Sequence, residues 1–176
     1  MIPGGLNALP PYLLRPGPRC TRAPRAARAD DCADANAVPT STNLPEVRAA
    51  ILCLHNRARE KSGLPPLKED AKLRKAANEH SAEMVRDRFF GHGDFVERLL
   101  ESGYADDRWD FGENLAWGAG DISTPQALMT AWLDSPGQRK TILTKGFRHL
   151  GIGLKLGLPT DPTVGITVTT DFGDRG

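Results

Sequence analysis

Long apolar runs are missing from the 176 residues, and none approaches the ~20 continuous apolar residues that a membrane-spanning helix needs. We therefore expect no transmembrane segment. Aromatic residues are also few, at 6%, although hydrophobic residues as a whole reach 39%. This amount of apolar material is enough for one compact domain and not for two.

Acidic residues are absent from residues 1–29, which contain five arginines, so the rest of the chain has 18 basic and 22 acidic residues. Nucleic-acid binding needs clustered basic residues on the folded surface, and we therefore expect none here. The Pro/Arg/Ala-rich composition cannot offset the entropy cost of ordering. We expect residues 1–44 to be disordered and residues 45–176 to form the domain.

The N-terminal segment is a poor secretion signal, because Pro10 and Pro11 interrupt its apolar part and its charges follow that part. However, a small-x-small pattern at residues 27–29 precedes Asp30, as at the end of a cleavage site. Our hypothesis is that the segment is the remnant of a targeting sequence and that the mature protein begins near Asp30.

Cysteine is scarce, with three residues: Cys20, Cys32 and Cys53. If Cys20 leaves with the tail, the other two can form one disulfide, worth about 3 kcal/mol in the chain-entropy account. Cys53 falls on the flank of an apolar helical stripe, where another segment can reach it. The alternative is that Cys53 is a semi-buried free thiol.

Helical patterns come first along the chain and strand patterns last. Helices are expected over residues 45–62 and 70–88, over the short stretch 94–103, and after the Thr124–Pro125 start signal. The glycine-flanked stretch 111–121 is predicted to be a strand or an extended loop. Alternating apolar residues predict two strands, over 150–156 and 163–172, joined as a hairpin. Helices packed on a sheet, an α+β fold, follow from this order.

Six motifs lie in the order and spacing of one known family: LHNRAREKSGLPPL, AANEHSAEM, FFGH, GENLAWG, AWLDSPGQRKTIL and FRHLGIGL. Over about residues 45–173 the chain resembles the CAP superfamily of cysteine-rich secretory proteins, antigen 5 and pathogenesis-related proteins, and most closely its bacterial extracellular branch. The resemblance implies a three-layer α-β-α sandwich with a central antiparallel sheet. It also implies secretion and a cleft lined in many members by two histidines and two acidic residues.

His92 and Glu113 match the first histidine and the first glutamate of that cleft. Gln138 stands where the second histidine is expected, and Ser135, with Asp134 beside it, where the second glutamate is expected. Zinc in a catalytic site takes three protein ligands, and a glutamine amide is a poor ligand. We therefore expect no required cofactor, and at most weak zinc binding by His92 and Glu113.

Gln138 also has an interpretation that needs no site. Ser135 and Gln138 have the spacing of a capping box, in which the two side chains satisfy free amides at a helix start, and Pro136 suits the first helical position. This interpretation makes the cleft a degenerate one. Among the other histidines, His80 is expected to be a hydrogen-bonded core residue, and no role is assigned to His55 or His149.

Two classes of function remain open. The first is a secreted, non-catalytic binding module for a small apolar, lipid-like ligand or for a partner at the cell envelope. The second is a metal-dependent hydrolase that uses the cleft residues, which would need a base and a full set of ligands. The residues favour the first, because the second requires Gln138 to be a histidine.

Overall fold

The computed structural model describes residues 32–104 and 110–174, and these form a four-stranded sheet between two layers of helices. The strands follow the order β1 (Lys68–Glu69), β3 (His149–Leu156), β4 (Ile166–Gly173) and β2 (Phe111–Gly118). The three long strands pair antiparallel, as predicted, and β3 and β4 form the predicted hairpin. The two-residue β1, which the sequence did not predict, pairs parallel to β3.

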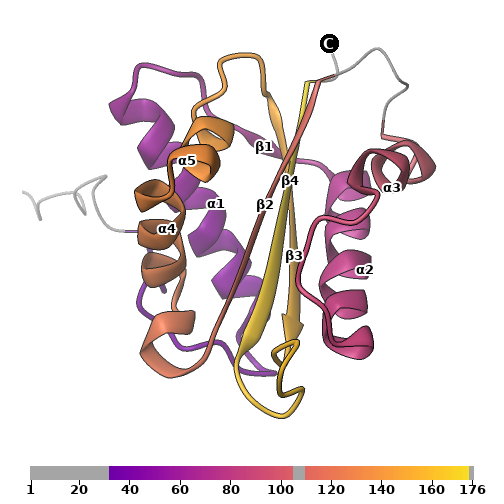
Figure 1. The fold of residues 1–176 in the computed structure, drawn as a ribbon. Helices are drawn as coiled ribbons and strands as arrows, with labels where there is room; N and C mark the ends of the chain where they lie inside the picture. The colour runs from indigo at the N-terminus through magenta and orange to yellow at the C-terminus, as the bar shows by residue number, and fades with distance from the viewer. Residues whose placement is uncertain (1–31, 105–109, 175–176) are drawn as a thin grey trace, which may run out of the picture. The chain divides into compact units, whose positions relative to one another are not determined.

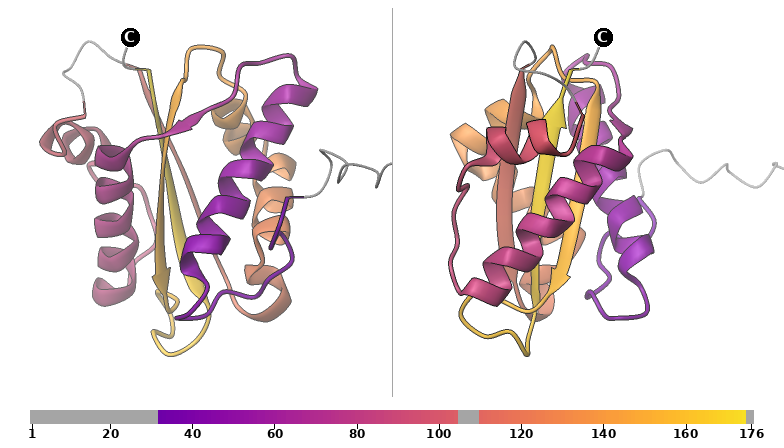
Figure 2. Two further views of the ribbon diagram at one scale, coloured as in Figure 1. Left: turned by 180° about the vertical axis from the view of Figure 1, so that it is seen from behind. Right: turned by 90° about the vertical axis from the view of Figure 1, so that its right-hand side faces the viewer.

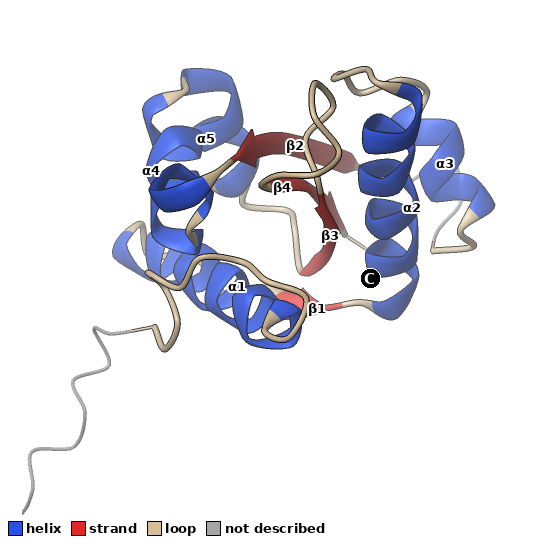
Figure 3. Ribbon diagram, turned by 90° about the horizontal axis from the view of Figure 1, so that it is seen from below, coloured by secondary structure: helices blue, strands red, loops and turns tan. Residues whose placement is uncertain are grey.

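The helices divide between the two faces of the sheet (Figures 1 and 2). One face carries α1 (Leu44–Lys61), α4 (Pro125–Asp134) and α5 (Pro136–Ile142), and the other carries α2 (Ala71–Asp87) and α3 (Phe95–Glu101). Figure 3 shows the sheet edge-on between these layers. The predicted α-β-α sandwich is therefore confirmed. No helix in the described ranges has the length and apolar character needed to cross a membrane.

Local signals set where the helices begin. The Asp70 side chain accepts hydrogen bonds from the amides of Lys72 and Leu73 at the start of α2. The Thr124 hydroxyl accepts one from the Ala127 amide at the start of α4, and Pro125 takes the first helical position. Both arrangements satisfy amides that lack a partner inside the helix. The expected helix starts are confirmed.

The main core lies between the sheet and the α1, α4 and α5 layer. Alternate side chains of β3 and β4 point into it, as the alternation in the sequence predicted. They meet Trp132 of α4 and Ile51 of α1, both almost completely buried. The strand residues of this core are Leu150, Ile152, Leu154, Ile166, Val168 and Phe172.

The other face of β3 carries glycine, which allows α2 to lie unusually close to the sheet. A Cβ atom on Gly151 would lie 2.1 Å from the backbone carbon of Leu73, and one on Gly153 would lie 2.1 Å from the backbone of Ala77. Any larger residue at these two positions would push α2 away from the sheet. The α2 face is therefore held together by backbone proximity more than by large apolar side chains.

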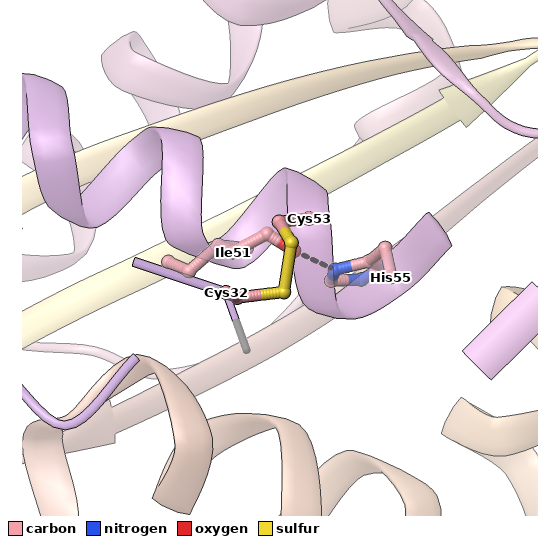
Figure 4. Close-up of a disulfide and its surroundings, with 4 residues drawn as sticks. All are labelled: Cys32, Ile51, Cys53 and His55. Carbon is pink, nitrogen blue, oxygen red and sulfur yellow. Dashed lines mark hydrogen bonds between the residues drawn. A yellow bond between two sulfur atoms is a disulfide. The ribbon is translucent and has the colours of Figure 1, made fainter. Parts of the chain in front are cut away.

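A disulfide joins Cys32 to Cys53 on α1, which confirms the predicted pair (Figure 4). The chain after Cys32 then runs beside α4, where the Gln126 amide donates a hydrogen bond to the Ala35 carbonyl. Residues 32–43 therefore belong to the folded unit, and the predicted boundary of disorder at residue 44 is too late. Cys20 and the proposed cleavage site near Asp30 lie outside the described residues.

Candidate functional site

His92 and Glu113 lie together, as the sequence predicted. His92 is in the loop between α2 and α3, and its Nδ1 is 2.7 Å from Oε1 of Glu113 on β2. The histidine side chain is 59% exposed and the glutamate side chain only 1%. Because an ionised carboxylate can only accept, Nδ1 donates this hydrogen bond, and Nε2 is then the nitrogen without a proton in a neutral ring. A buried carboxylate therefore orients a half-exposed imidazole.

Arg98 of α3 completes this group, which the sequence analysis missed. Its Nη2 donates to the second oxygen of Glu113, Oε2. The same guanidinium donates to the backbone carbonyl of His92 at 3.3 and 3.4 Å. Both oxygens of Glu113 are thus engaged, one by the His92 imidazole and one by the fixed positive charge of Arg98. The only signal in the sequence was that a short helix with an arginine follows His92 closely.

Asp171 lies directly beside this group. It pairs with Glu113 in the register of β2 and β4 and is fully buried, and a protonated Asp171 carboxyl group can donate a hydrogen bond to the Glu113 carboxylate. Burial raises the pKa of Asp171 well above its ordinary value, and the negative charge of Glu113 raises it further, against a smaller lowering by Arg98. The uncharged carboxyl group is therefore favoured.

Gln138 does not form the predicted capping box. Ser135 is at the N-cap of α5, but its side chain makes no capping hydrogen bond. The amide Nε2 of Gln138 instead donates to the Leu115 carbonyl at 2.9 Å, and Trp132 Nε1 donates to the same carbonyl at 3.0 Å. Because β2 is at the edge of the sheet, no neighbouring strand supplies an amide to the Leu115 carbonyl, and side chains donate to it instead. The predicted Pro136 position in the first turn is confirmed.

The five predicted cleft residues come from different elements around β2. His92 and Glu113 meet on the side of the sheet that faces α2 and α3. Asp134, Ser135 and Gln138 lie at the junction of α4 and α5, where Gln138 is bound to the edge of β2. Within the described part of the chain, no three His, Cys, Asp or Glu residues are placed so that they could hold a metal ion. The donor set does not fit a zinc site, which needs three protein ligands.

The remaining histidines have clear environments. His80 is buried, with Nε2 2.9 Å from the Gly91 carbonyl and Nδ1 3.2 Å from the Glu83 carboxylate, so the predicted core role is confirmed. His149 has a partner that the sequence did not suggest, because its Nδ1 is 2.7 Å from the Tyr104 hydroxyl.

His55 is completely buried in the main core. Its Nδ1 is 2.8 Å from the Ile51 carbonyl (Figure 4), and its ring contacts those of Trp132 and Phe172. Nε2 has no partner among the described residues. Burial lowers the pKa of His55 to about 4, so the neutral ring is the folded form at neutral pH.

A pocket of about 380 Å³ lies beside β2, next to the helices α4 and α5. Its lining is mainly apolar and includes Phe90, Trp117 and Ile122, all of which are exposed large hydrophobic residues, while the Gln138 side chain contributes a polar group. The rings of Phe90 and Trp117 meet edge to face at 6.4 Å. This volume falls in the range of small-molecule sites, about 300–1,000 Å³.

A larger hollow of about 580 Å³ lies between α2 and α3. Its lining is strongly acidic, with five carboxylates and two arginines. The acidic residues are Glu79, Glu83, Asp94, Glu97 and Glu101, and the arginines are Arg86 and Arg98. An apolar molecule would gain little there, so the smaller pocket beside β2 is the better candidate for such a ligand.

Comparison with known proteins gives a family match. The model of the cysteine-rich secretory protein (CAP) family matches residues 52–158. The uncharacterized protein YkwD of Bacillus subtilis (strain 168) is 31% identical over 138 residues, 76% of this chain and 51% of YkwD. The uncharacterized membrane protein YlbC of the same strain is 36% identical over 109 residues, 59% of this chain and 30% of YlbC. The chain thus spans about half or less of these curated relatives.

Two solved structures share the fold. An extracellular protein with an SCP domain from Bacillus anthracis str. Ames has a TM-score of 0.59 and 26% identity, over 78% of this chain and 45% of that one. An outer surface protein of Borrelia burgdorferi has a TM-score of 0.58 and 23% identity, over 79% of this chain and 97% of that one. The second likeness concerns the fold alone.

Proposed function

The chain belongs to the cysteine-rich secretory protein (CAP) family, and from that premise we propose that it is a secreted, non-catalytic binding module for a small apolar ligand. The pocket beside β2 carries this proposal. Secretion is supported by the Cys32–Cys53 disulfide, which is typical of oxidising compartments, and by the extracellular protein among its structural relatives. A partner at the cell envelope is the alternative occupant of the same surface.

The pocket combines an apolar wall with one polar group. Trp117 and Ile122 expose 43% and 64% of their surface, an arrangement that costs free energy unless something covers them. The Gln138 amide is held in place by its hydrogen bond to the Leu115 carbonyl, so it is a fixed polar group at the pocket wall. Ligand sites of this kind gain affinity from the apolar wall and orientation from the few polar groups.

A hydrolase is the second candidate function. The observation that favours it is the 2.7 Å contact between His92 and Glu113, since a carboxylate that orients an imidazole is a common feature of general-base sites. The metal-dependent form of this hypothesis lacks support, because the described residues do not supply three ligands. We therefore place binding before catalysis.

A titration of the full chain with a fluorescent fatty acid tests the proposal. Ile122→Glu places a charge in the pocket, and we expect it to weaken binding about tenfold or more, because burying an unpaired charge is costly. Val164→Glu is the matched control, since Val164 is a half-exposed valine in the loop between β3 and β4 and does not line the pocket. Absence of saturable binding by the parent, or equal loss in both variants, would contradict the proposal.

A further inference from the structure

The buried Glu113 needs a positive charge beside it. Its side chain is only 1% exposed, and an ionised carboxylate at such depth is strongly destabilising without a counter-charge. The neighbouring Asp171 cannot supply the charge, because it is a second carboxyl group. His92 meets the other oxygen as a hydrogen-bond donor and has its ring largely in solvent. Only Arg98 brings a fixed positive charge to Glu113 among the described contacts.

Arg98 is held in this position by more than the ion pair. Its side chain is 15% exposed, and its guanidinium also donates to the His92 carbonyl. It therefore connects three elements, namely α3, the loop that carries His92, and β2. A planar guanidinium with several donors suits such a bridge, whereas an ammonium group would make fewer of these contacts.

We infer that Arg98 is the built-in cation of this cleft: its guanidinium compensates Glu113 and occupies the carboxylate oxygen that a metal ion would need. The chain thus differs from the cleft of two histidines and two acidic residues that the family resemblance implies. Here Arg98 itself neutralises the negative charge of Glu113, and the conformation of His92 and Glu113 is independent of metal. The inference does not depend on the apolar pocket.

Zinc titration of the full chain by calorimetry tests this role, together with the shift in unfolding temperature that zinc causes. Arg98→Gln removes the charge and frees Oε2 of Glu113, and we expect it to bind zinc at least about tenfold more tightly than the parent, because repulsion between two cations at one carboxylate disappears. Adding His92→Ala to Arg98→Gln should abolish the gain. Arg98→Lys keeps the charge and should behave like the parent.

The matched control is Arg86→Gln. Arg86, like Arg98, lines the acidic hollow between α2 and α3. It pairs with Asp87 at the surface and does not contact Glu113, so its loss should leave zinc binding unchanged. The inference is overturned if the parent binds zinc through His92 with the affinity of Arg98→Gln, or if Arg98→Gln responds to zinc no more than the parent and Arg86→Gln. Should Arg98→Gln fold poorly, zinc must restore its unfolding temperature, and a failure to do so also overturns the inference.

Discussion

The two faces of the sheet are built in different ways. The face toward α1, α4 and α5 is packed with large apolar side chains around Trp132. The face toward α2 and α3 has glycine, threonine and carboxyl groups, with Ser81 bonded to Thr169 and Glu113 beside Asp171. The first face therefore stabilises the fold by burying apolar side chains. The second face can bury polar and charged side chains, because close backbone contact at the glycines positions α2.

Each face also buries a titratable group whose pKa shifts toward its uncharged form, and the two groups should make stability depend on pH in opposite directions. Folding lowers the pKa of His55 in the apolar core, whereas folding raises the pKa of Asp171 in the polar layer. Acid should therefore weaken the first face, and a rise in pH should weaken the second. This contrast can be measured separately for each face.

The largest expected effect is on the apolar face. Phe172→Ala should lower the free energy of unfolding by about 4 kcal/mol, because it leaves a cavity in a fully buried core. Urea unfolding of the parent and the variant measures the difference. Val164→Ala, at a half-exposed position, is the control and should change the value little. Equal effects of the two substitutions would show that the core does not stabilise the fold in the way described.

The next effect is the acid sensitivity caused by His55. Its pKa falls from 6.5 to about 4 on folding, so the unfolded chain takes up a proton first as the pH drops. Stability present above pH 6.5 should be lost progressively down to about pH 4, by about 3 kcal/mol for the full shift. His55→Gln should show a smaller loss in urea unfolding between these pH values. Equal losses in parent and variant would contradict this assignment.

The polar face should show the reverse slope. The raised pKa of Asp171 means that the folded chain keeps a proton that the unfolded chain releases near the ordinary Asp pKa, so stability falls as the pH rises above that value. Asp171→Asn cannot ionise and should lack this loss, so its advantage over the parent should grow with pH. A difference between the two proteins that is constant with pH would exclude a buried neutral Asp171.

The smallest expected effect is at the edge of β2. Gln138→Ala removes one of two donors to the Leu115 carbonyl and should cost about 1 kcal/mol, since Trp132 still donates to the same oxygen. Ser135→Ala is the matched substitution and should be close to neutral, because the Ser135 side chain makes no capping hydrogen bond. The capping-box interpretation expects both changes to destabilise α5, and thermal unfolding separates the two cases.

The sequence predicted what depends on local pattern. Alternating apolar residues located β3 and β4, the start signal at Thr124 located α4, and the position of Cys53 on the flank of its helix anticipated the disulfide. It also brought His92 and Glu113 together through the family resemblance. The strands and the helix start follow from short stretches of chain whose preferences the fold does not override, whereas the His92–Glu113 contact was expected only from the family resemblance.

Contacts between distant segments could not be predicted in this way. Arg98 and Asp171 meet at Glu113 from α3 and β4, and no spacing along the chain encodes that meeting. Gln138 had the correct spacing for a cap, but the unpaired Leu115 carbonyl at the sheet edge competes for its amide. The two-residue β1 is too short for any alternation to be visible.

One measurement tests the central claim that this CAP domain binds an apolar ligand without metal. The full chain is titrated with a fluorescent fatty acid before and after extensive treatment with EDTA, with Ile122→Glu measured in parallel. We expect saturable binding that EDTA leaves unchanged and that Ile122→Glu weakens. Binding that disappears with EDTA and returns with zinc, or the absence of binding under both conditions, would contradict the claim.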